Sequence, residues 1–271
     1  MSLAGIGVFD SGVGGLTVAR SLTKRLPMEE IVYLGDTARV PYGSKSAETV
    51  LRYSKMATDF LVAQGVKMVV IACNTASAFA IDALREQLPL PVLGVIEPGA
   101  KAAVAATRTG DIGVIGTLGT VRSGSYPRAI AKLDDKMRVT ARACPLFVPL
   151  AEEGWLDDDI AAAVARRYLR ELAADAPDLD TLVLGCTHYP LLRPLIGRVA
   201  QEVFGRQVAL VDSADTMAES AHDELARLGL LRPDDAAAGH LQCYVTDDAR
   251  IDEVASRFLG RPLKSAIRVD L

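Results

Sequence analysis

The sequence lacks the features that mark nucleic-acid-binding and membrane-spanning proteins. Its 271 residues include 30 lysines and arginines against 34 aspartates and glutamates, so the net charge is −4. An acidic chain without a basic cluster has no field that attracts nucleic acid or an anionic membrane. The most apolar stretch, residues 66–81, is interrupted by Asn74 and Thr75 and is shorter than the roughly 20 residues that span a bilayer. We therefore expect neither kind of partner.

A signal peptide and a disulfide framework are also missing. The first residues show no basic segment followed by a long apolar run, which predicts a cytoplasmic protein. The cysteines form no CxxC pair and have no spacing typical of a zinc site, and only three histidines are present, so we expect no metal. In a reducing cytosol the thiols should be free. The four cysteines are Cys73, Cys144, Cys186 and Cys243, of which Cys144 and Cys243 should be small buried side chains.

What the sequence does have is an alternation of short β-branched runs and longer amphipathic segments. Strand-like runs cover residues 5–10, 30–36, 67–73, 90–96, 111–117, 181–186 and 207–213, and helical patterns cover 47–64 and 157–174. This βαβ rhythm predicts an α/β protein with mainly parallel sheets covered by helices. In such sheets ligands bind at the carboxyl ends of the strands, so the residues that end each run are the candidates for a site.

Two pairs of segments resemble each other within the chain. VVIACNTAS (69–77) and LVLGCTHYP (182–190) each consist of a strand, a cysteine, small hydrogen-bonding residues and a helix start. IGVFDSGVGG (6–15) is matched more weakly by IGVIGTLGT (112–120). We therefore expect two related α/β lobes with the active site in the cleft between them, to which each lobe contributes one cysteine.

The lobe boundaries follow from breaks in this pattern. Pro98 and Gly99 interrupt it, which predicts a change of lobe near residue 97. The late strand at 207–213 should rejoin the first lobe, which would then be built from both ends of the chain. The expected bounds are 1–97 plus 208–271 for the first lobe and 98–207 for the second.

The polar residues at the first two strand ends allow both a structural and a functional interpretation. GVFDSGVGG lacks the lysine and hydroxyl residue of a P-loop, so its glycines are interpreted as a tight strand-to-helix turn. Asp10 beside that turn is either a helix cap or a site residue. Tyr42 and Gly43 in DTARVPYG form either a surface turn or a loop whose backbone amides bind a carboxylate.

The same two interpretations apply to the residues around the cysteines. Asn74, Thr75 and Thr187 are either helix caps or donors to a ligand. His188 alone indicates a structural imidazole, and Glu152 or Glu153 alone indicates a solvated carboxylate. A thiol beside an imidazole also suggests a cysteine hydrolase, but the matching ACNTAS segment favours a pair of thiols instead.

Six motifs, taken in chain order, resemble the glutamate racemases of the aspartate/glutamate racemase superfamily. They are GVFDSGVGG, DTARVPYG, ACNTAS, GTLGT, CPLFVPLAEEG and GCTHYPLL, and the resemblance extends from about residue 5 to VDSADTMAE. It implies an enzyme that interconverts L-glutamate and D-glutamate without a cofactor and supplies D-glutamate for bacterial peptidoglycan. Homodimers are common among such enzymes, so a homodimer is expected.

The resemblance also implies roles for the matching residues. Cys73 and Cys186 would be the two acid/base thiols. Asp10 would assist on the Cys73 side, whereas Glu152, chosen by its spacing from CPLFVPL, and His188 would assist on the Cys186 side. The substrate would be bound by Asp10, Ser11, Tyr42, Gly43, Asn74, Thr75 and Thr187, and also by Thr117 and Thr120 from GTLGT.

Racemisation explains why two thiols are needed. The reaction removes a proton from one face of Cα and returns one to the other, so a single fixed base would mostly regenerate the starting enantiomer. A cysteine with a pKa of ~8.5 needs only a modest shift to act as a thiolate base, while its partner remains a thiol acid. Nothing indicates a pyridoxal cofactor, so hydroxyls, backbone N–H groups and helix N-termini must stabilise the carbanion.

Two other functions are open on the sequence alone. Paired thiols do not measure the length of a side chain, so a racemase for aspartate or another acidic amino acid is the alternative. A more remote one is a catalytically inert two-lobed protein that binds an anion at the same strand ends.

Overall fold

The computed structural model describes residues 4–271 and confirms an α/β protein with parallel sheets. Within this described part, one sheet has six strands and the other four, and all neighbouring strands pair in parallel. The chain forms two compact units, one comprising the residues up to Val95 together with Ala214–Leu271 and the other Ile96–Ser213. Residues 1–3, which belong to the expected first lobe, lie outside the described part.

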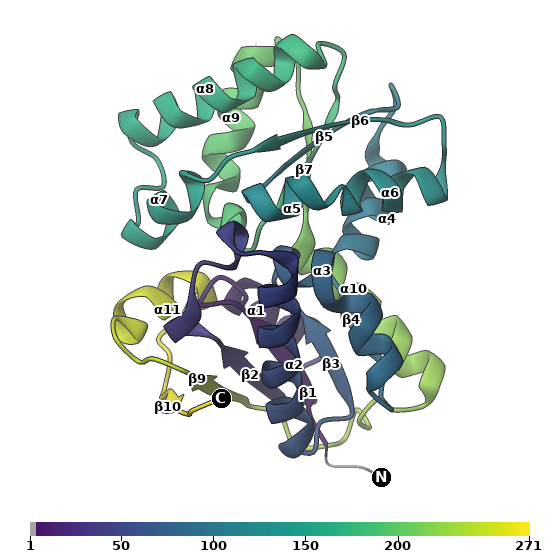
Figure 1. Cartoon of the computed structure of the whole chain (residues 1–271), viewed down its shortest axis with the longest axis vertical. Helices are drawn as coiled ribbons and strands as arrows, with labels where there is room; N and C mark the ends of the chain where they lie inside the picture. Colours follow the sequence, from purple (N-terminus) through teal and green to yellow (C-terminus); the bar gives the residue numbers. More distant parts are fainter. Residues whose placement is uncertain (1–3) are drawn as a thin grey trace. The chain divides into compact units, whose positions relative to one another are not determined.

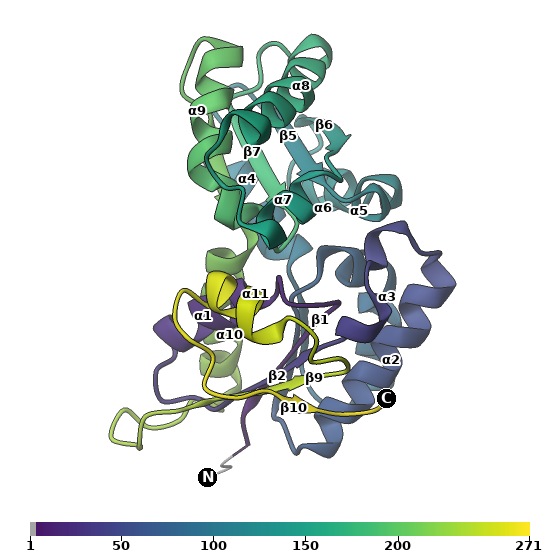
Figure 2. The ribbon, with the colours of Figure 1, turned by 90° about the vertical axis from the view of Figure 1, so that its left-hand side faces the viewer.

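The six-stranded unit has the strand order β10-β9-β2-β1-β3-β4 (Figure 1). Its strands are β1 (Ile6–Asp10), β2 (Ile31–Gly35), β3 (Met68–Ile71), β4 (Val92–Gly94), β9 (Leu241–Val245) and β10 (Ile267–Arg268). Its helices are α1 (Leu16–Arg25), α2 (Ala47–Ala63), α3 (Asn74–Gln87), α10 (Ser213–Leu228) and α11 (Ile251–Leu259), with 3-10 turns η1 (Thr37–Arg39) and η2 (Tyr42–Ser44). Figure 2 shows α2 and α3 on one face of this sheet and α1 and α11 on the other.

The four-stranded unit has the strand order β6-β5-β7-β8. Its strands are β5 (Asp111–Gly116), β6 (Arg138–Ala143), β7 (Thr181–Gly185) and β8 (Ala209–Asp212). Its helices are α4 (Ile96–Ala106), α5 (Leu118–Ser123), α6 (Ser125–Leu133), α7 (Phe147–Glu153), α8 (Asp159–Asp175) and α9 (Arg193–Phe204), with the 3-10 turn η3 (Tyr189–Leu192) before α9. Helix α4 packs with α6, and α8 packs with α9.

The two units share one strand order. The run β2-β1-β3-β4 in the first sheet corresponds to β6-β5-β7-β8 in the second, with the first strand of each set inside, the second on one side and the third on the other. Cys73 follows β3 and Cys186 follows β7, the third strands of the two sets. The sequence similarity around the two cysteines therefore corresponds to equivalent places in the two sheets.

The central strands β1 and β3 of the first sheet are buried on both faces, as their unbroken apolar runs predict. Phe9 and Ile71 pack in a cluster with Leu61 of α2. Val8 and Val70 alternate with them along the strands, point to the opposite face and are fully buried as well. The burial of both faces holds β1 and β3 rigidly, and with them the residues that follow their carboxyl ends.

The expected return to the first lobe at residue 208 is wrong. The strand at Ala209–Asp212 is β8, which pairs with β7 and belongs to the four-stranded sheet. The return occurs instead at α10, because the second part of the first unit begins at Ala214. An apolar run indicates a strand but carries no information about which of two sheets it joins.

The first crossing between the units lies before Pro98 and Gly99 rather than at them. The chain passes from one unit to the other between Val95 and Ile96, and Pro98 and Gly99 lie in the first turn of α4, which begins at Ile96. Proline is tolerated there because the N–H groups of a first helical turn have no intrahelical partner. The interruption of the apolar pattern therefore indicates a helix start.

Three strands were not predicted, and each lacks a long apolar run. Strand β6, with the sequence RVTARA, lies at the edge of its sheet and has no fully buried residue. Both residues of β10, at the edge of the other sheet, are exposed. Strand β9 has only three buried residues at its carboxyl end. Strands at or near an edge are partly solvated, which removes the signal by which the central strands are found.

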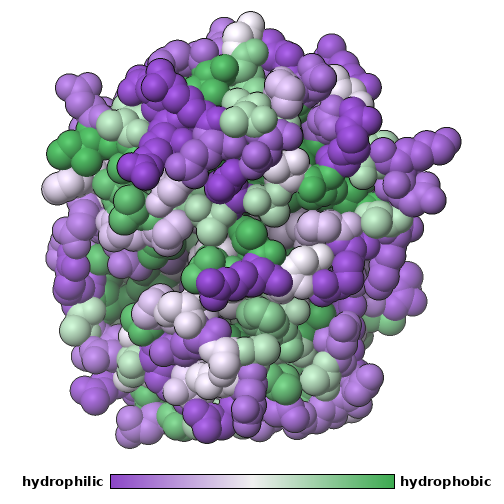
Figure 3. Space-filling view, turned by 45° about the horizontal axis from the view of Figure 1, so that its top comes forward, coloured by the Kyte–Doolittle hydropathy of each residue, from purple (hydrophilic) through white to green (hydrophobic). Residues whose placement is uncertain are grey.

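The surface seen in Figure 3 mixes hydrophilic residues with smaller hydrophobic areas. Three of the exposed large hydrophobic side chains lie close together in the sequence, namely Leu146, Trp155 and Ile160. In the described part of the chain, no helix combines the length and the apolar character needed to cross a membrane.

Candidate active site

The carboxyl ends of β1 and β3 bring Ser11 and Cys73 together in the first unit. The two strands pair with Phe9 opposite Ile71, so the residues that follow them emerge at the same edge of the sheet. The Ser11 Oγ lies 3.4 Å from the Cys73 Sγ, and the thiol is only 6% exposed. Two of the residues proposed from sequence thus form one hydrogen-bonded pair.

Cys73 is also the N-cap residue of α3. Its Sγ lies 3.5 Å from the backbone N of Ala76, in the place where a serine or aspartate side chain commonly accepts a hydrogen bond. The N-terminus of an α-helix favours negative charge, and this one is 14 residues long. Asn74 and Thr75 are buried in the first turn, while the cap position itself is occupied by the cysteine.

Asp10 closes the turn that follows β1. The carboxyl group is fully buried, and its Oδ2 accepts a hydrogen bond from the backbone N of Gly12 at 2.9 Å. Gly15 lies directly against it, since a Cβ at that position would be 2.4 Å from the Asp10 Cβ. Glycine therefore allows α1 to begin in contact with the carboxylate, beside the strand end that carries Ser11.

Tyr42 is part of the protein core, although its motif has the composition of a surface turn. Its side chain is 1% exposed and packs between Phe9 and Tyr53, with ring centroids 6.1 Å and 5.8 Å away. The hydroxyl donates a hydrogen bond to Asp36 Oδ2 at 2.5 Å. Burial, and then the charge of Asp36, raise the pKa of Tyr42 well above its usual value, so the phenol stays protonated as a donor. The side chain supports the loop that presents Tyr42 and Gly43.

In the second unit, Thr117 and Thr120 lie at the end of β5. Thr117 is the N-cap of α5 and accepts a hydrogen bond from the backbone N of Thr120 at 3.2 Å, and the two hydroxyl oxygens are 3.0 Å apart. Gly116 at the end of β5 pairs with Gly185 at the end of β7. The two threonines therefore share a sheet edge with Cys186.

His188 connects Cys186 with Glu152. The imidazole Nδ1 lies 3.9 Å from the Cys186 Sγ, and Nε2 lies 2.9 Å from Glu152 Oε1. Cys186, Thr187 and His188 are all buried, whereas the Glu152 side chain is 38% exposed. One imidazole thus contacts a buried thiol on one side and a partly solvated carboxylate on the other.

These contacts favour the charged form of His188. Burial by itself lowers the pKa of the imidazole, but the hydrogen bonds with Cys186 and Glu152 and the negative charges on them outweigh it and raise the pKa to about 10. An imidazolium carries a proton on both nitrogens, so it donates to Cys186 and to Glu152 at the same time. The arrangement therefore places a proton donor beside the Cys186 sulfur.

Tyr189, which the sequence analysis did not include, holds the His188 turn against α7. Its hydroxyl donates to the Cys144 carbonyl oxygen at 2.8 Å, and its ring meets the Phe147 ring edge-on at 5.2 Å. Helix α7 begins at Phe147 and carries Glu152, so these contacts set the distance between Glu152 and the imidazole. Tyr189 could have been identified from the sequence, because the tyrosine that follows His188 in GCTHYP needs a hydrogen-bond partner when it is buried.

The remaining cysteines and histidines lie in other surroundings. All four cysteines are free and buried, as expected. Burial raises the pKa of Cys243 to about 12 and that of Cys144 further still, which makes both thiols unreactive. The rings of His222 and His240 contact the carboxyl groups of Asp223 and Glu30. Within the described residues, no group of three His, Cys, Asp or Glu side chains could hold a metal ion.

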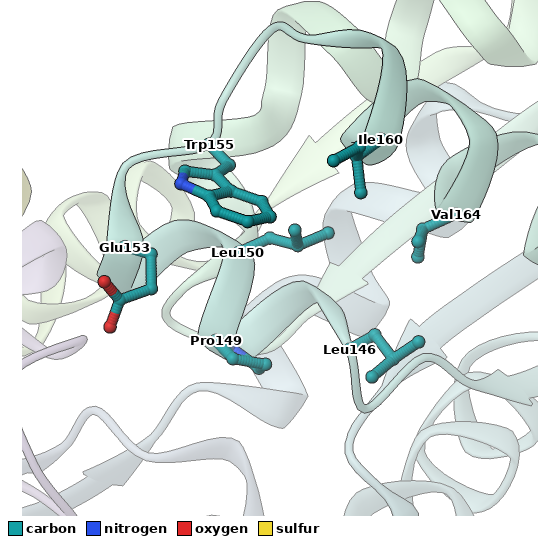
Figure 4. A pocket seen from close by; sticks show the side chains of 7 residues that line it. All are labelled: Leu146, Pro149, Leu150, Glu153, Trp155, Ile160 and Val164. Carbon is teal, nitrogen blue, oxygen red and sulfur yellow. The ribbon is translucent and has the colours of Figure 1, made fainter.

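An apolar pocket lies between α7 and α8, with an accessible volume of about 230 Å³. Figure 4 shows its seven lining side chains, which are Leu146, Pro149, Leu150, Glu153, Trp155, Ile160 and Val164. Its lining includes none of the residues proposed from sequence. Glu153 lies at the edge of this pocket, whereas the preceding residue, Glu152, contacts His188. The two consecutive carboxylates therefore lie in different surroundings.

Comparison with known protein families identifies the family of this chain. The Asp/Glu/hydantoin racemase model matches residues 12–221. The chain belongs to the Asp/Glu/hydantoin racemase family. The glutamate racemase of Geobacter metallireducens is 52% identical over 267 residues, which cover 98% of this chain and 96% of that protein. The glutamate racemase of Bacillus cereus is 42% identical, with coverage of 98% and 97%.

Solved structures of the same family have the same fold. The glutamate racemase of Thermus thermophilus in complex with beta-chloro-D-alanine has a TM-score of 0.87 and 48% identity, covering 99% of this chain and 97% of that one. The glutamate racemase of Francisella tularensis in complex with D-glutamate has a TM-score of 0.90 and 34% identity, covering 100% and 98%. The aspartate racemase of Picrophilus torridus, at 15% identity and a TM-score of 0.54, shares the fold alone.

Proposed function

We propose that this protein is a glutamate racemase that interconverts L-glutamate and D-glutamate without a cofactor. The observation that carries the proposal is the equivalent placement of Cys73 and Cys186, each after the third strand of a sheet with the same strand order. Identities of 52% and 42% with glutamate racemases over nearly the whole chain support glutamate as the substrate. The product D-glutamate is a component of bacterial peptidoglycan.

In the proposed mechanism, the two thiols work on opposite faces of the substrate Cα. One cysteine, as thiolate, takes the α-proton and becomes a thiol, and the electron pair of the C–H bond remains on the substrate. The other cysteine, as thiol, donates its proton to the opposite face and becomes a thiolate. The two thiols have then exchanged roles, so the same pair catalyses the reverse reaction.

The surroundings of the two thiols support this assignment. Cys73 has the Ser11 hydroxyl and the α3 N-terminus beside its sulfur, and Asp10 lies at the adjacent strand end. Cys186 has the His188 imidazole, which is held in turn by Glu152. We assign Asp10 to the Cys73 side, and Glu152 and His188 to the Cys186 side, as groups that hold or relay the thiol proton.

Substrate binding must also stabilise the carbanion, because the α-proton of an amino acid is far less acidic than a thiol. We propose hydroxyl and backbone N–H groups of the strand-end motifs for this task, since fixed donors in a dry site stabilise developing charge. The proposed binding residues are Asp10, Ser11, Tyr42, Gly43, Asn74, Thr75, Thr117, Thr120 and Thr187.

Deuterium incorporation tests the two-thiol mechanism. In D₂O, the wild-type enzyme should place deuterium at Cα of either glutamate enantiomer, and Cys73→Ala and Cys186→Ala should each lower racemisation at least about 10³-fold, because each removes a group that transfers a proton. Proton NMR of the α-position measures exchange, and chiral chromatography measures racemisation. Cys243→Ala, a buried thiol away from these motifs, is the control.

Two outcomes would refute the mechanism. If the wild-type enzyme racemised glutamate in D₂O without placing deuterium at Cα, proton transfer with solvent exchange would be excluded. If both single variants racemised glutamate at the normal rate, the assignment of the two thiols would be excluded. The alternative substrate is tested in the same assay, since a higher kcat/KM for L-aspartate than for L-glutamate would make the protein an aspartate racemase.

We further propose that the enzyme is a homodimer in the cytoplasm. Peptidoglycan precursors are made in that compartment. Sedimentation equilibrium tests the dimer, whose mass would be twice the 28.8 kDa of the chain.

A further inference from the structure

A buried carboxylate, Asp36, lies at the centre of the loop that contains Tyr42 and Gly43. Asp36 is fully buried at the end of β2 and is the first residue of DTARVPYG. Both of its oxygens are engaged: Arg39 Nε lies 2.9 Å from Oδ1 and 2.8 Å from Oδ2, and the Tyr42 hydroxyl donates to Oδ2. Two residues of the loop therefore converge on one carboxylate.

The carboxylate is itself anchored to the sheet. The Thr246 hydroxyl donates to Asp36 Oδ1 at 3.0 Å and accepts a hydrogen bond from the Ala38 N at 2.9 Å. The backbone N of Asp36 donates to the Asp10 carbonyl oxygen at 3.0 Å. Since Asp10 ends β1 and Thr246 follows β9, the loop is connected to strands on both sides of β2.

A second set of contacts holds the partners of Asp36. The Arg39 guanidinium lies over the Tyr53 ring of α2, 4.5 Å from its centroid, and Tyr53 also packs against the Tyr42 ring. Thr37 Oγ1 donates to the Asp247 carbonyl oxygen at 2.6 Å and accepts from the Asp247 N at 2.8 Å. These contacts hold Arg39, Tyr42 and Thr37 in place beside the contacts that Asp36 makes itself.

We propose that Asp36 is the positioning residue of the substrate-binding loop: its carboxylate joins Arg39, Tyr42 and Thr246 and thereby sets where Tyr42 and Gly43 meet the substrate. Asp36 acts through Tyr42 and the loop backbone, not on the reacting atoms. The inference rests on the proposed function, in which Tyr42 and Gly43 bind glutamate. We call Asp36 and its three partners, Arg39, Tyr42 and Thr246, the hub. The inference predicts that loss of a hydrogen bond in the hub weakens substrate binding more than it slows proton transfer.

The test compares steady-state racemisation of L-glutamate by Asp36→Asn, Thr246→Val and Thr246→Ser. Loss of a hydrogen bond to a charged group in the hub should raise KM about tenfold in Asp36→Asn and about threefold in Thr246→Val, with kcat within about threefold of wild type. Thr246→Ser keeps the hydroxyl, so its KM should stay within about twofold of wild type. This rescue distinguishes the hydrogen bond from the packing of the side chain.

Asp180→Asn is the matched control for a carboxylate-to-amide change in a loop. Asp180 accepts hydrogen bonds from the Thr107 hydroxyl and the Arg108 and Thr109 N–H groups, but it lies before β7, at the amino ends of the strands. Its variant should melt at a lower temperature with an unchanged KM. An equal rise of KM in this variant would show that general loss of stability, and not the hub, weakens binding.

The outcomes separate failure of the positioning role from failure of the proposed function. An unaltered KM in folded Asp36→Asn refutes the positioning role, as does a fall of kcat with KM unchanged. If Asp36→Asn does not fold, Thr246→Val and Tyr42→Phe decide, and wild-type KM values in both refute the role. A wild-type enzyme that does not racemise glutamate refutes the proposed function itself.

Discussion

At the scale of the residue, the four cysteines show how surroundings determine the chemistry of one side chain. All are free and buried. Cys144 and Cys243 have pKa values raised by burial, which keeps them as neutral thiols. Cys73 and Cys186 instead have a polar partner beside the sulfur, the Ser11 hydroxyl and the His188 imidazole respectively. The difference was visible in the sequence, because only these two stand between an apolar strand and a run of polar residues.

The raised pKa of His188 leads to a prediction about Glu152. Replacing Glu152 by Gln removes the negative partner 2.9 Å from Nε2, so the pKa of His188, about 10 in the wild type, should fall. NMR titration measures it directly, and only three histidines have to be assigned. Glu153→Gln, the neighbouring carboxylate at the apolar pocket, is the control and should leave the titration unchanged.

The same shift determines the sign of a pH effect on stability. Because the folded pKa of His188 lies above its ordinary value of 6.5, the contribution to stability is complete below pH 6.5 and is lost as the pH rises through about 10. The difference in unfolding free energy between wild type and Glu152→Gln should therefore shrink over this window. A His188 that titrates near 6.5 in both proteins would contradict the assignment.

At the scale of the element, the strand–turn–helix unit was the most predictable part of the fold. The central strands and the helices α2 and α8 lie close to their predicted ranges, because helices cover both faces of the sheets and leave the runs unbroken. The turn after β1 followed from its glycines, and the contact of Gly15 with Asp10 gives the reason. Strands β6 and β10 could not be found, since edge strands face solvent.

Helix α8 permits a test of element stability away from the proposed site. Asp158 is its N-cap and accepts hydrogen bonds from the Ile160 and Ala161 N–H groups at 2.9 Å and 2.8 Å. Asp158→Ala should lower the free energy of unfolding by about 1 kcal/mol, because two N–H groups of the first turn lose their acceptor. Denaturant unfolding measures the change, and kcat/KM should not change.

Asp159→Ala provides the comparison for this prediction. Asp159 is the first residue of the same helix and does not occupy the cap position. Its loss should cost only a few tenths of a kcal/mol, from the interaction of the carboxylate with the helix dipole. Equal losses in the two variants would mean that charge, and not capping, stabilises this end of α8.

At the scale of the whole molecule, a buried ion pair joins distant segments of the first unit. Lys67 Nζ lies 2.6 Å from Glu29 Oε2, with both side chains almost fully buried, and also donates to the Leu230 carbonyl oxygen at 2.7 Å. Glu29 Oε1 accepts from the Arg232 N at 2.8 Å. The segment that follows α10 is thereby attached to the residues that precede β2 and β3, which closes the discontinuous unit.

Lys67→Met tests the importance of that connection. The substitution leaves Glu29 charged and buried without its ionic partner, so the free energy of unfolding should fall by about 3–5 kcal/mol. Arg25→Met is the control, because the Arg25–Glu219 pair also connects to α10 but is exposed, and such pairs contribute at most about 1 kcal/mol. Similar losses in the two variants, measured by denaturant unfolding, would contradict the role assigned to burial.

The sequence by itself determined the α/β class, the central strands and the two cysteine motifs, because these depend on local periodicity and on which residues follow an apolar run. Only the tertiary structure decided that β8 joins the second sheet, since strand pairing depends on segments far apart in the chain. It also decided that the Asp36 carboxylate accepts a hydrogen bond from Thr246, which lies 210 residues away. Long-range contacts of this kind leave no periodic pattern in a single sequence, and they set the geometry in which the local motifs act.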